Sequence, residues 1–123
     1  MRELVEKCYT QSGSQLNIIK EAKDFIDENY MKNITLTQVA AHCYLSPAHF
    51  SRYFKKTTGG NFIDYLNDVR ISKAQNLLLT TNHNVNEICL LVGYSSMTYF
   101  YKKFKAITGL TAQEFRNKNR KHQ

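Results

Sequence analysis

The stretch SPAHFSRYFKKTTG, residues 46–59, contains the features that decide the fold. It begins with a serine, which is a typical helix N-cap, and a proline, whose missing amide hydrogen is not needed in a first helical turn. It ends with Gly59, which can take the left-handed conformation that closes a helix. Between these signals, Phe50 and Phe54 are four residues apart and therefore share one face. The stretch predicts a short helix with an aromatic packing face and a polar, cationic face opposite.

Much of this pattern returns fifty residues later. Five of the ten positions from 50 to 59 are identical at 100–109, among them both phenylalanines and the closing glycine. Upstream the offset is forty-nine, which pairs Val39 with Ile88 and gives the second copy one extra residue in its turn. The sequence therefore contains an internal duplication of a short helix, a tight turn and a longer helix, which is the pattern of a helix-turn-helix.

Apolar residues at helical spacing predict further helices around the two copies. We expect helices at 14–30 and 35–43, and a long helix at 62–79 that runs between the copies. Five Gly and one Pro in 123 residues speak against a turn-rich β protein. The fold class is thus predicted as all-α, with two helix-turn-helix subdomains joined by a long linker helix and about seven helices in total.

This organisation gives the chain five parts. They are a linker or tail from an upstream domain at 1–13, a first lobe at 14–60, the linker helix at 61–80, a second lobe at 81–118 and a basic tail at 119–123.

The charge is strongly basic and unevenly placed. Seventeen Lys and Arg against ten Asp and Glu give a net charge of +7. Residues 101–123 carry seven basic side chains and one acidic side chain, whereas residues 1–30 carry four basic and six acidic ones. This asymmetry indicates a surface attracted to phosphates, in nucleic acid or in acidic lipid headgroups. The alternative is charge that serves solubility, with a solvated basic tail that includes Arg120.

The composition argues against several other classes of protein. No apolar run is longer than 88–92, so neither a membrane span nor a signal peptide is expected. Cys8, Cys43 and Cys89 are odd in number and lack C-x-x-C spacing, which fits reduced thiols in the cytoplasm. His42 and Cys43 point about 100° apart on a helix and would seldom share a metal ion. We therefore expect no metal and no cofactor.

The faces opposite the paired phenylalanines contain the candidate binding residues. They combine small, polar and cationic side chains, and no acid occurs at 46–58 or 96–108. Small residues permit close approach to a major groove, and long donors reach base edges or phosphates. The DNA-binding candidates of the first copy are Ala48, His49, Ser51, Arg52, Lys55 and Lys56, and those of the second copy are Ser96, Met97, Thr98, Tyr101, Lys102 and Lys105.

Residues 34–118 resemble the DNA-binding domain of the AraC/XylS family of bacterial transcription regulators. The resemblance rests on LSPAHFSRYFKKTTG, YLNDVRISKAQNLL and EICLLVGYSSMTYFYKKFKAITGLTAQEFR, in this order along the chain. It implies a two-lobed, seven-helix domain that binds double-stranded promoter DNA and usually activates transcription by contacting RNA polymerase. It also implies an upstream sensor or receiver domain, as in response-regulator members. The residues implied to read the grooves are Ala48, Ser51 and Arg52 in the first lobe, and Met97, Thr98, Tyr101 and Lys102 in the second.

Three positions depart from the pattern of the family. Tyr44 stands where the second copy has Gly93, so the first turn is expected to be strained or differently shaped. Met97 occupies a place often filled by Gln, and Lys102 one often filled by Arg. Lys102 would then be a phosphate anchor, with Met97 or Tyr101 contacting a thymine methyl group.

Other residues have simpler structural interpretations. Tyr53, Phe62, Tyr65 and Tyr99 are expected to pack within the lobes, and Arg70 is expected to fasten the linker helix to a lobe. His49 would either meet a phosphate or lie idle on the surface.

Three other functions are alternatives to duplex binding. An enzyme is disfavoured because no phosphate-binding Gly-rich loop, metal motif or activated nucleophile is present. A helical protein-interaction module would bind its partner in a salt-insensitive way through an apolar groove. A single-strand or RNA binder would need aromatic side chains free for stacking, whereas the aromatics here have core spacing.

Overall fold

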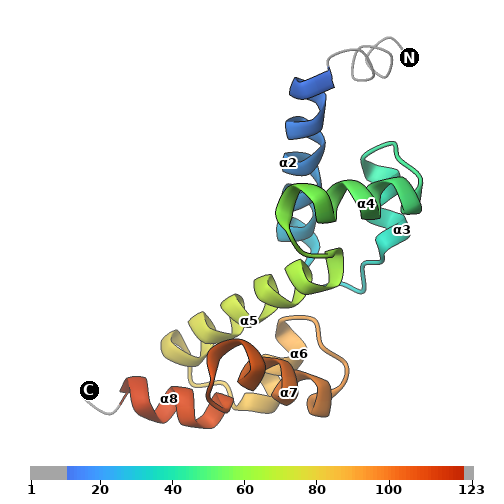
Figure 1. The fold of residues 1–123 in the computed structure, drawn as a ribbon. Coiled ribbons are helices and arrows are strands. Elements are labelled where there is room, and N and C mark those ends of the chain that lie inside the picture. The colour runs from blue at the N-terminus through green and yellow to red at the C-terminus, as the bar shows by residue number, and fades with distance from the viewer. Residues whose placement is uncertain (1–10, 121–123) are drawn as a thin grey trace. The chain divides into compact units, whose positions relative to one another are not determined.

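The computed structural model describes residues 11–120 (Figure 1). Its regular structure is formed by α2 (Gln11–Asn29), α3 (Leu36–His42), α4 (Pro47–Thr58), α5 (Phe62–Thr80), α6 (Val85–Leu91), α7 (Met97–Thr108) and α8 (Ala112–Arg120). These seven helices, with no strand in the described part of the chain, confirm the predicted all-α fold. No helix there is both long and apolar enough to cross a lipid bilayer.

Two helix boundaries differ from the prediction by more than one residue. Helix α2 begins at Gln11, so the last three residues of the expected linker at 1–13 are helical. The rest of that linker, with Cys8, lies outside the described residues. Helix α8 continues to Arg120, two residues past the expected end of the second lobe. Arg120 is therefore helical and does not belong to a solvated tail, while residues 121–123 lie outside the described part.

The duplicated helices begin and end in the same way. The Ser46 hydroxyl accepts a hydrogen bond from the His49 amide at 3.1 Å, and the Ser96 hydroxyl accepts one from the Tyr99 amide, also at 3.1 Å. Both helices then close on a left-handed glycine, with φ of 86° at Gly59 and 85° at Gly109. Local capping chemistry thus sets where α4 and α7 begin and end.

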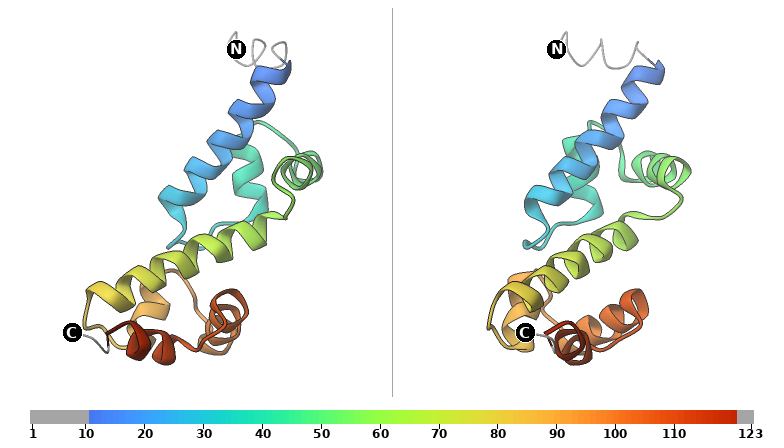
Figure 2. Two further views of the ribbon diagram at one scale, coloured as in Figure 1. Left: turned by 60° about the vertical axis from the view of Figure 1, so that its left-hand side comes forward. Right: turned by 90° about the vertical axis from the view of Figure 1, so that its left-hand side faces the viewer.

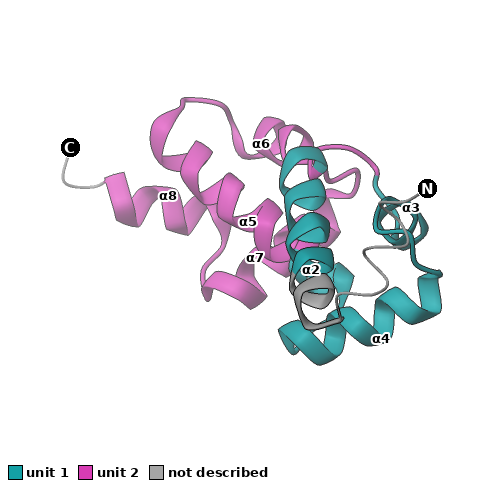
Figure 3. Ribbon diagram, turned by 90° about the horizontal axis from the view of Figure 1, so that it is seen from above, with its two compact units in different colours: residues 1–29, 34–65 teal, residues 30–33, 66–123 magenta. Residues whose placement is uncertain are grey.

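The chain divides into two compact units (Figure 3). Among the described residues, the first comprises 11–29 and Ile34–Tyr65, and the second comprises Tyr30–Asn33 and 66–120. Helix α5 is one uninterrupted helix, as both views of Figure 2 show. It contributes its first turn to the first unit and its remainder to the second, so the helix expected as a linker belongs to both cores.

The first unit is built around the aromatic pair of α4. Phe50 and Phe54 are fully buried, and their ring centroids are 5.3 Å apart. Val39 and Ala40 of α3 are also fully buried. The ring of Tyr65, from the first turn of α5, meets Phe54 edge-on at 5.8 Å. The paired phenylalanines therefore occupy the packing face that the sequence predicts for them.

The second unit repeats this arrangement. Phe100 and Phe104 of α7 are fully buried with ring centroids 5.8 Å apart, and Ile88 of α6 is buried in the same cluster. Phe115 of α8 meets Phe104 edge-on at 5.7 Å, as Tyr65 meets Phe54 in the first unit. The duplication inferred from the sequence thus extends to the helix that follows each copy.

The turn between the two short helices has a positive φ in both units. Gly93 has φ of 107°, and the corresponding Tyr44 has φ of 63°. Left-handed φ is costly for a residue with a Cβ atom. The substitution of tyrosine for glycine therefore leaves the first turn strained, as expected.

Candidate nucleic-acid interface

Helix α4 presents a cationic face in the first unit. Arg52, Lys55 and Lys56 are exposed. Among residues 11–120, no carboxylate lies within ion-pair distance of these three side chains. Their charges are therefore available to a polyanion.

The remaining candidates of α4 lie beside these cations. Ala48 and His49 are exposed and Ser51 is half-buried. The rings of His49 and Tyr53 pack edge-to-face at 5.6 Å. A shallow surface depression is lined by His49, Arg52, Tyr53, Lys55, Lys56 and Thr57. The face thus combines a small residue near the start of the helix with long donors further along it.

Helix α7 presents the corresponding face in the second unit. Thr98, Tyr101, Lys102 and Lys105 are exposed. Within the described chain, Lys102 has no carboxylate at ion-pair distance. Lys105 contributes to lowering the pKa of Glu114 in α8, although the hydrogen bond from the Thr111 amide is the largest cause. The positive charge of Lys105 is therefore partly offset by Glu114, whereas Lys102 has no such carboxylate close to it in the described chain.

Two DNA-binding candidates of the second unit, Ser96 and Met97, have structural roles. Met97 is only half-exposed, and its side chain packs against the buried cluster of this unit. Ser96 is exposed, but its hydroxyl accepts the capping hydrogen bond of α7. Whether either contacts a ligand stays a prediction, as it does for every candidate residue of both units.

The exposed Tyr101 is held by the preceding helix. Its hydroxyl donates a hydrogen bond to Oδ1 of Asn86 in α6 at 3.1 Å. The ring lines a shallow depression together with the first residues of α6 and of α8. Asn86 was not among the residues singled out from the sequence, because nothing local marks an exposed asparagine as the partner of a tyrosine fifteen residues away.

A series of hydrogen bonds centred on the buried Asn67 connects α5 to Tyr94 and to Tyr99 of α7. Asn67 of α5 is 4% exposed and accepts a hydrogen bond from the Tyr94 hydroxyl at 2.6 Å. Its amide nitrogen donates to the Tyr99 hydroxyl at 3.0 Å. Burial raises the pKa of Tyr94 well above its ordinary value. Nζ of Lys103 lies 5.5 Å from the centroid of the Tyr99 ring. The expected packing role of Tyr99 is therefore met through its hydroxyl, although its ring remains partly exposed.

Arg70 fastens α5 within the second unit, as predicted. Its Nε donates to the carbonyl of Tyr30 at 2.7 Å and its Nη2 to the carbonyl of Lys32 at 2.9 Å. The guanidinium lies 5.2 Å from the centroid of the Tyr94 ring, and burial lowers the pKa of Arg70. Gly93 lies against this contact, so Arg70 is a structural cation that is not available to DNA.

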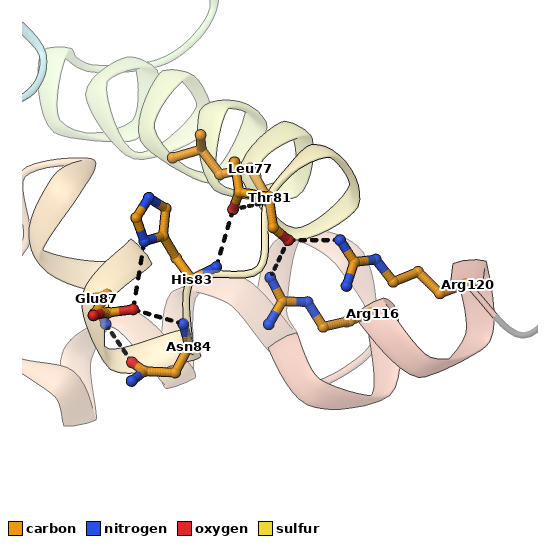
Figure 4. A network of polar contacts seen from close by, with 7 residues as sticks. All are labelled: Leu77, Thr81, His83, Asn84, Glu87, Arg116 and Arg120. Carbon is orange, nitrogen blue, oxygen red and sulfur yellow. Dashed lines mark hydrogen bonds and ion pairs between the residues drawn. The ribbon is translucent and has the colours of Figure 1, made fainter. Parts of the chain in front are cut away.

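Helix α8 carries two similar arginines (Figure 4). Arg116 donates from Nε to the carbonyl of Leu78 and from Nη2 to that of Thr81, each at 3.0 Å. Arg120 also donates to the Thr81 carbonyl. Both belong to the seven basic residues that give the C-terminal segment 101–123 its basic excess. They instead bind the last carbonyls of α5 and the turn after it, so this excess overstates the charge available to phosphates.

The predicted packing residues otherwise lie as expected. Phe62 is buried and Tyr53 and Tyr65 are half-buried. Burial raises the pKa of Tyr65 to about 12, and Asp27, which accepts a hydrogen bond from the phenol at 3.3 Å, adds to the effect. Cys43 and Cys89 are both buried, and burial raises the pKa of the Cys89 thiol.

Two duplicated helix-turn-helix units, each exposing the acid-free cationic face of its second helix, define a DNA-binding domain. A family profile described as a helix-turn-helix domain matches residues 39–118. The chain belongs to the AraC-type family of helix-turn-helix transcription regulators.

Individual relatives agree with this assignment. The bifunctional transcriptional activator and DNA repair enzyme AdaA of Bacillus subtilis is 37% identical over 93 residues, which are 76% of this chain and 44% of AdaA. The C-terminal domain of the two-component response regulator yesN from Fusobacterium nucleatum has a TM-score of 0.76 at 36% identity, covering 81% of this chain and 98% of that domain. The DNA-binding domain of AdpA, solved with a target DNA, has a TM-score of 0.80 at 25% identity, with 85% and 95% coverage. The chain spans less than half the length of the curated relatives it matches.

Proposed function

We propose that this chain binds promoter DNA in a sequence-specific manner, with α4 and α7 entering consecutive major grooves of one duplex. The observation that carries the proposal is the repeated division of these two helices into a buried phenylalanine face and an exposed, acid-free cationic face. If these two helices served only packing, nothing would exclude acidic residues from the exposed faces of both.

The candidate residues of α4 would have different roles in DNA binding, according to their chemistry. Arg52 is the candidate for bidentate recognition of guanine, because its planar guanidinium matches the two acceptors of that base. Lys55 and Lys56 would neutralise phosphates and supply affinity through counterion release. Ala48 would allow close approach to the base edges, with His49 and Ser51 as neighbouring polar contacts.

The residues of α7 would act with less hydrogen-bonding specificity. Thr98, Tyr101 and Lys102 are the outward candidates for the groove, and Lys105 is a candidate phosphate contact. Because Met97 packs inward and the Ser96 hydroxyl caps the helix, these two would contribute mainly by shaping the start of α7.

The biological role that we propose is transcriptional activation in a bacterial cytoplasm, without enzymatic activity of this domain. RNA polymerase would be the protein partner. An upstream sensor or receiver domain would control the DNA-binding part. The supporting observations are that the relatives include a transcriptional activator and the C-terminal domain of a two-component response regulator.

Selection of bound duplexes from a random pool at two salt concentrations tests the proposal. We expect one enriched sequence, with affinity that falls steeply as salt rises. Arg52→Ala should cost about 1–3 kcal/mol of binding free energy and relax preference at one base pair. Lys56→Ala should weaken binding to all sequences and lower the slope of log K against log salt by about 1.

Lys20→Ala is the matched control, because it removes the same charge from α2, where Lys20 is paired with Asp24 at 2.8 Å. It should leave both the preferred sequence and the salt slope unchanged. The proposal would be rejected if no sequence were enriched, or if binding to DNA did not respond to salt.

A further inference from the structure

Helix α7 lacks the guanidinium and amide side chains that read bases through planar pairs of hydrogen bonds. Its twelve residues include no Arg, Asn or Gln. The exposed candidates offer hydroxyl groups, which discriminate poorly between base edges, and ammonium groups, which lack the planar fork of arginine. Thymine can be recognised without a hydrogen bond, because it displays a 5-methyl group in the major groove. An apolar surface on α7 would suffice to recognise it.

Tyr101 supplies such a surface in a fixed position. Its side chain is 44% exposed, so ring surface is open to a ligand. Its hydroxyl hydrogen is directed to Oδ1 of Asn86 at 3.1 Å and is not available to a base. Since the ring is already held between α6 and α7, little side-chain entropy remains to be lost on binding.

The other large side chains near the start of α7 are engaged elsewhere. Met97 packs against the buried cluster of the second unit. Tyr99 accepts a hydrogen bond from Asn67, and Lys103 lies over its ring. Tyr99 is thus also fixed, and it is 38% exposed, but Lys103 lies over its ring, so Tyr101 is the aromatic side chain of this segment with the more open ring.

The arrangement occurs in the second unit alone among the described residues. The offset of fifty pairs Tyr101 with Ser51, and the offset of forty-nine pairs Asn86 with Thr37. No hydrogen bond joins Ser51 and Thr37 in the described chain. The tyrosine and its asparagine are thus a local departure from the shared pattern, which suggests that the two helices read different bases.

We propose that Tyr101 recognises the 5-methyl group of a thymine, and that Asn86 is a positioning residue that holds the Tyr101 ring against it. The proposal rests on the proposed role of α7 as a groove-reading helix. It gives the two helices distinct preferences, with α4 favouring guanine through Arg52 and α7 favouring thymine through Tyr101.

Replacing thymine by uracil tests this directly, because the exchange removes only the methyl group. Each thymine of the selected duplex is replaced in turn, and the affinity of the unmodified 123-residue chain is measured by fluorescence anisotropy. We expect one uracil to weaken binding about fourfold, the factor corresponding to burial of one methyl group. The other replacements should have little effect.

Protein variants then assign the methyl contact. Tyr101→Ala should bind the thymine and uracil duplexes equally. Tyr101→Phe and Asn86→Ala should each reduce the preference for thymine. In the Tyr101→Phe background, Asn86→Ala should cause no further loss of this preference. Asn86→Asp keeps an oxygen acceptor for the phenol, so it should keep the preference while lowering overall affinity through repulsion of phosphates. Ile107→Ala, a change at another exposed apolar residue of α7, should keep the preference intact.

The possible results separate this proposal from the proposed function. Sequence-specific, salt-dependent binding without any effect of uracil would overturn the role of Tyr101 and leave the DNA-binding function standing. A thymine preference that persists in Tyr101→Ala would also overturn it and point to Thr98. Absence of specific DNA binding by the unmodified chain would overturn both. If Tyr101→Ala fails to fold in circular dichroism, the uracil scan and the Tyr101→Phe variant still decide the question.

Discussion

An added Cβ atom would meet closer neighbours at Gly93 than at Gly59, Gly60 or Gly109, and replacing Gly93 by alanine is predicted to be strongly destabilising. A Cβ atom built at Gly93 would lie 2.6 Å from the Tyr30 carbonyl oxygen and 2.9 Å from Nε of Arg70. These are the two atoms of a hydrogen bond 2.7 Å long. The added methyl group would therefore have to displace both partners of a partly buried, charge-assisted contact.

The expected cost combines two physical effects. Left-handed φ, here 107°, costs a residue with a Cβ about 1–2 kcal/mol. Loss of a hydrogen bond to a charged group costs about 1.5–3 kcal/mol. We therefore expect Gly93→Ala to lower the free energy of unfolding by about 2.5–5 kcal/mol, a large share of the 5–15 kcal/mol typical of a folded protein.

Gly109→Ala is the matched control for this measurement. Gly109 also has a positive φ, of 85°, but a Cβ there would meet no atom within 4 Å. This variant should show only the conformational part, about 1–2 kcal/mol. Urea unfolding followed by far-ultraviolet circular dichroism gives both values. Equal losses for the two variants would refute the argument, since they would show that the contacts around Gly93 relax without cost.

Three further predictions concern the cores and the phenols. Phe54→Ala should destabilise the protein by about 3–5 kcal/mol in the same urea titration, because it empties a fully buried aromatic site; a loss below 1 kcal/mol would contradict the packing described. Tyr94→Phe should cost about 1–3 kcal/mol by leaving the buried Asn67 carbonyl without its donor, and an unchanged stability would argue against that hydrogen bond. Stability should fall as pH rises from about 10 to 12, since the unfolded chain releases the Tyr65 proton near its ordinary pKa whereas the folded chain, with a pKa of about 12, retains it; Tyr65→Phe should make this decline shallower, and an identical pH profile for the variant would contradict the assignment.

The helices and their caps could be predicted because their signals are local. A serine, a proline and a closing glycine define α4 within fourteen residues, and the same frame recurs at α7. The packing face of each helix followed from the spacing of two phenylalanines. Alignment of the two copies also placed Tyr44 at a glycine position, which is how its strained φ was anticipated.

The polar contacts could not be predicted in the same way, because their partners are distant in sequence. Asn67 bonds to tyrosines 27 and 32 residues away, and Arg116 bonds to carbonyls 35 and 38 residues away. No periodicity reveals such pairings. An asparagine at a buried position of an otherwise apolar helix face is the signal that would have drawn attention to Asn67. The arginines of α8 offered no comparable signal, since charge alone does not distinguish a capping guanidinium from a phosphate-binding one.

The sharing of α5 between the two cores has a consequence for how the chain unfolds. Phe62 and Tyr65 belong to the first unit, while Ile71, Ala74 and Leu78 are buried in the second. If the second unit lost its packing, α5 would begin to fray from its C-terminal end. The first turn of α5, which contains Phe62 and packs in the first unit, would then be less stable. The melting of one half should therefore lower the melting temperature of the other, and a protease that cuts within α5 should destabilise both halves at once.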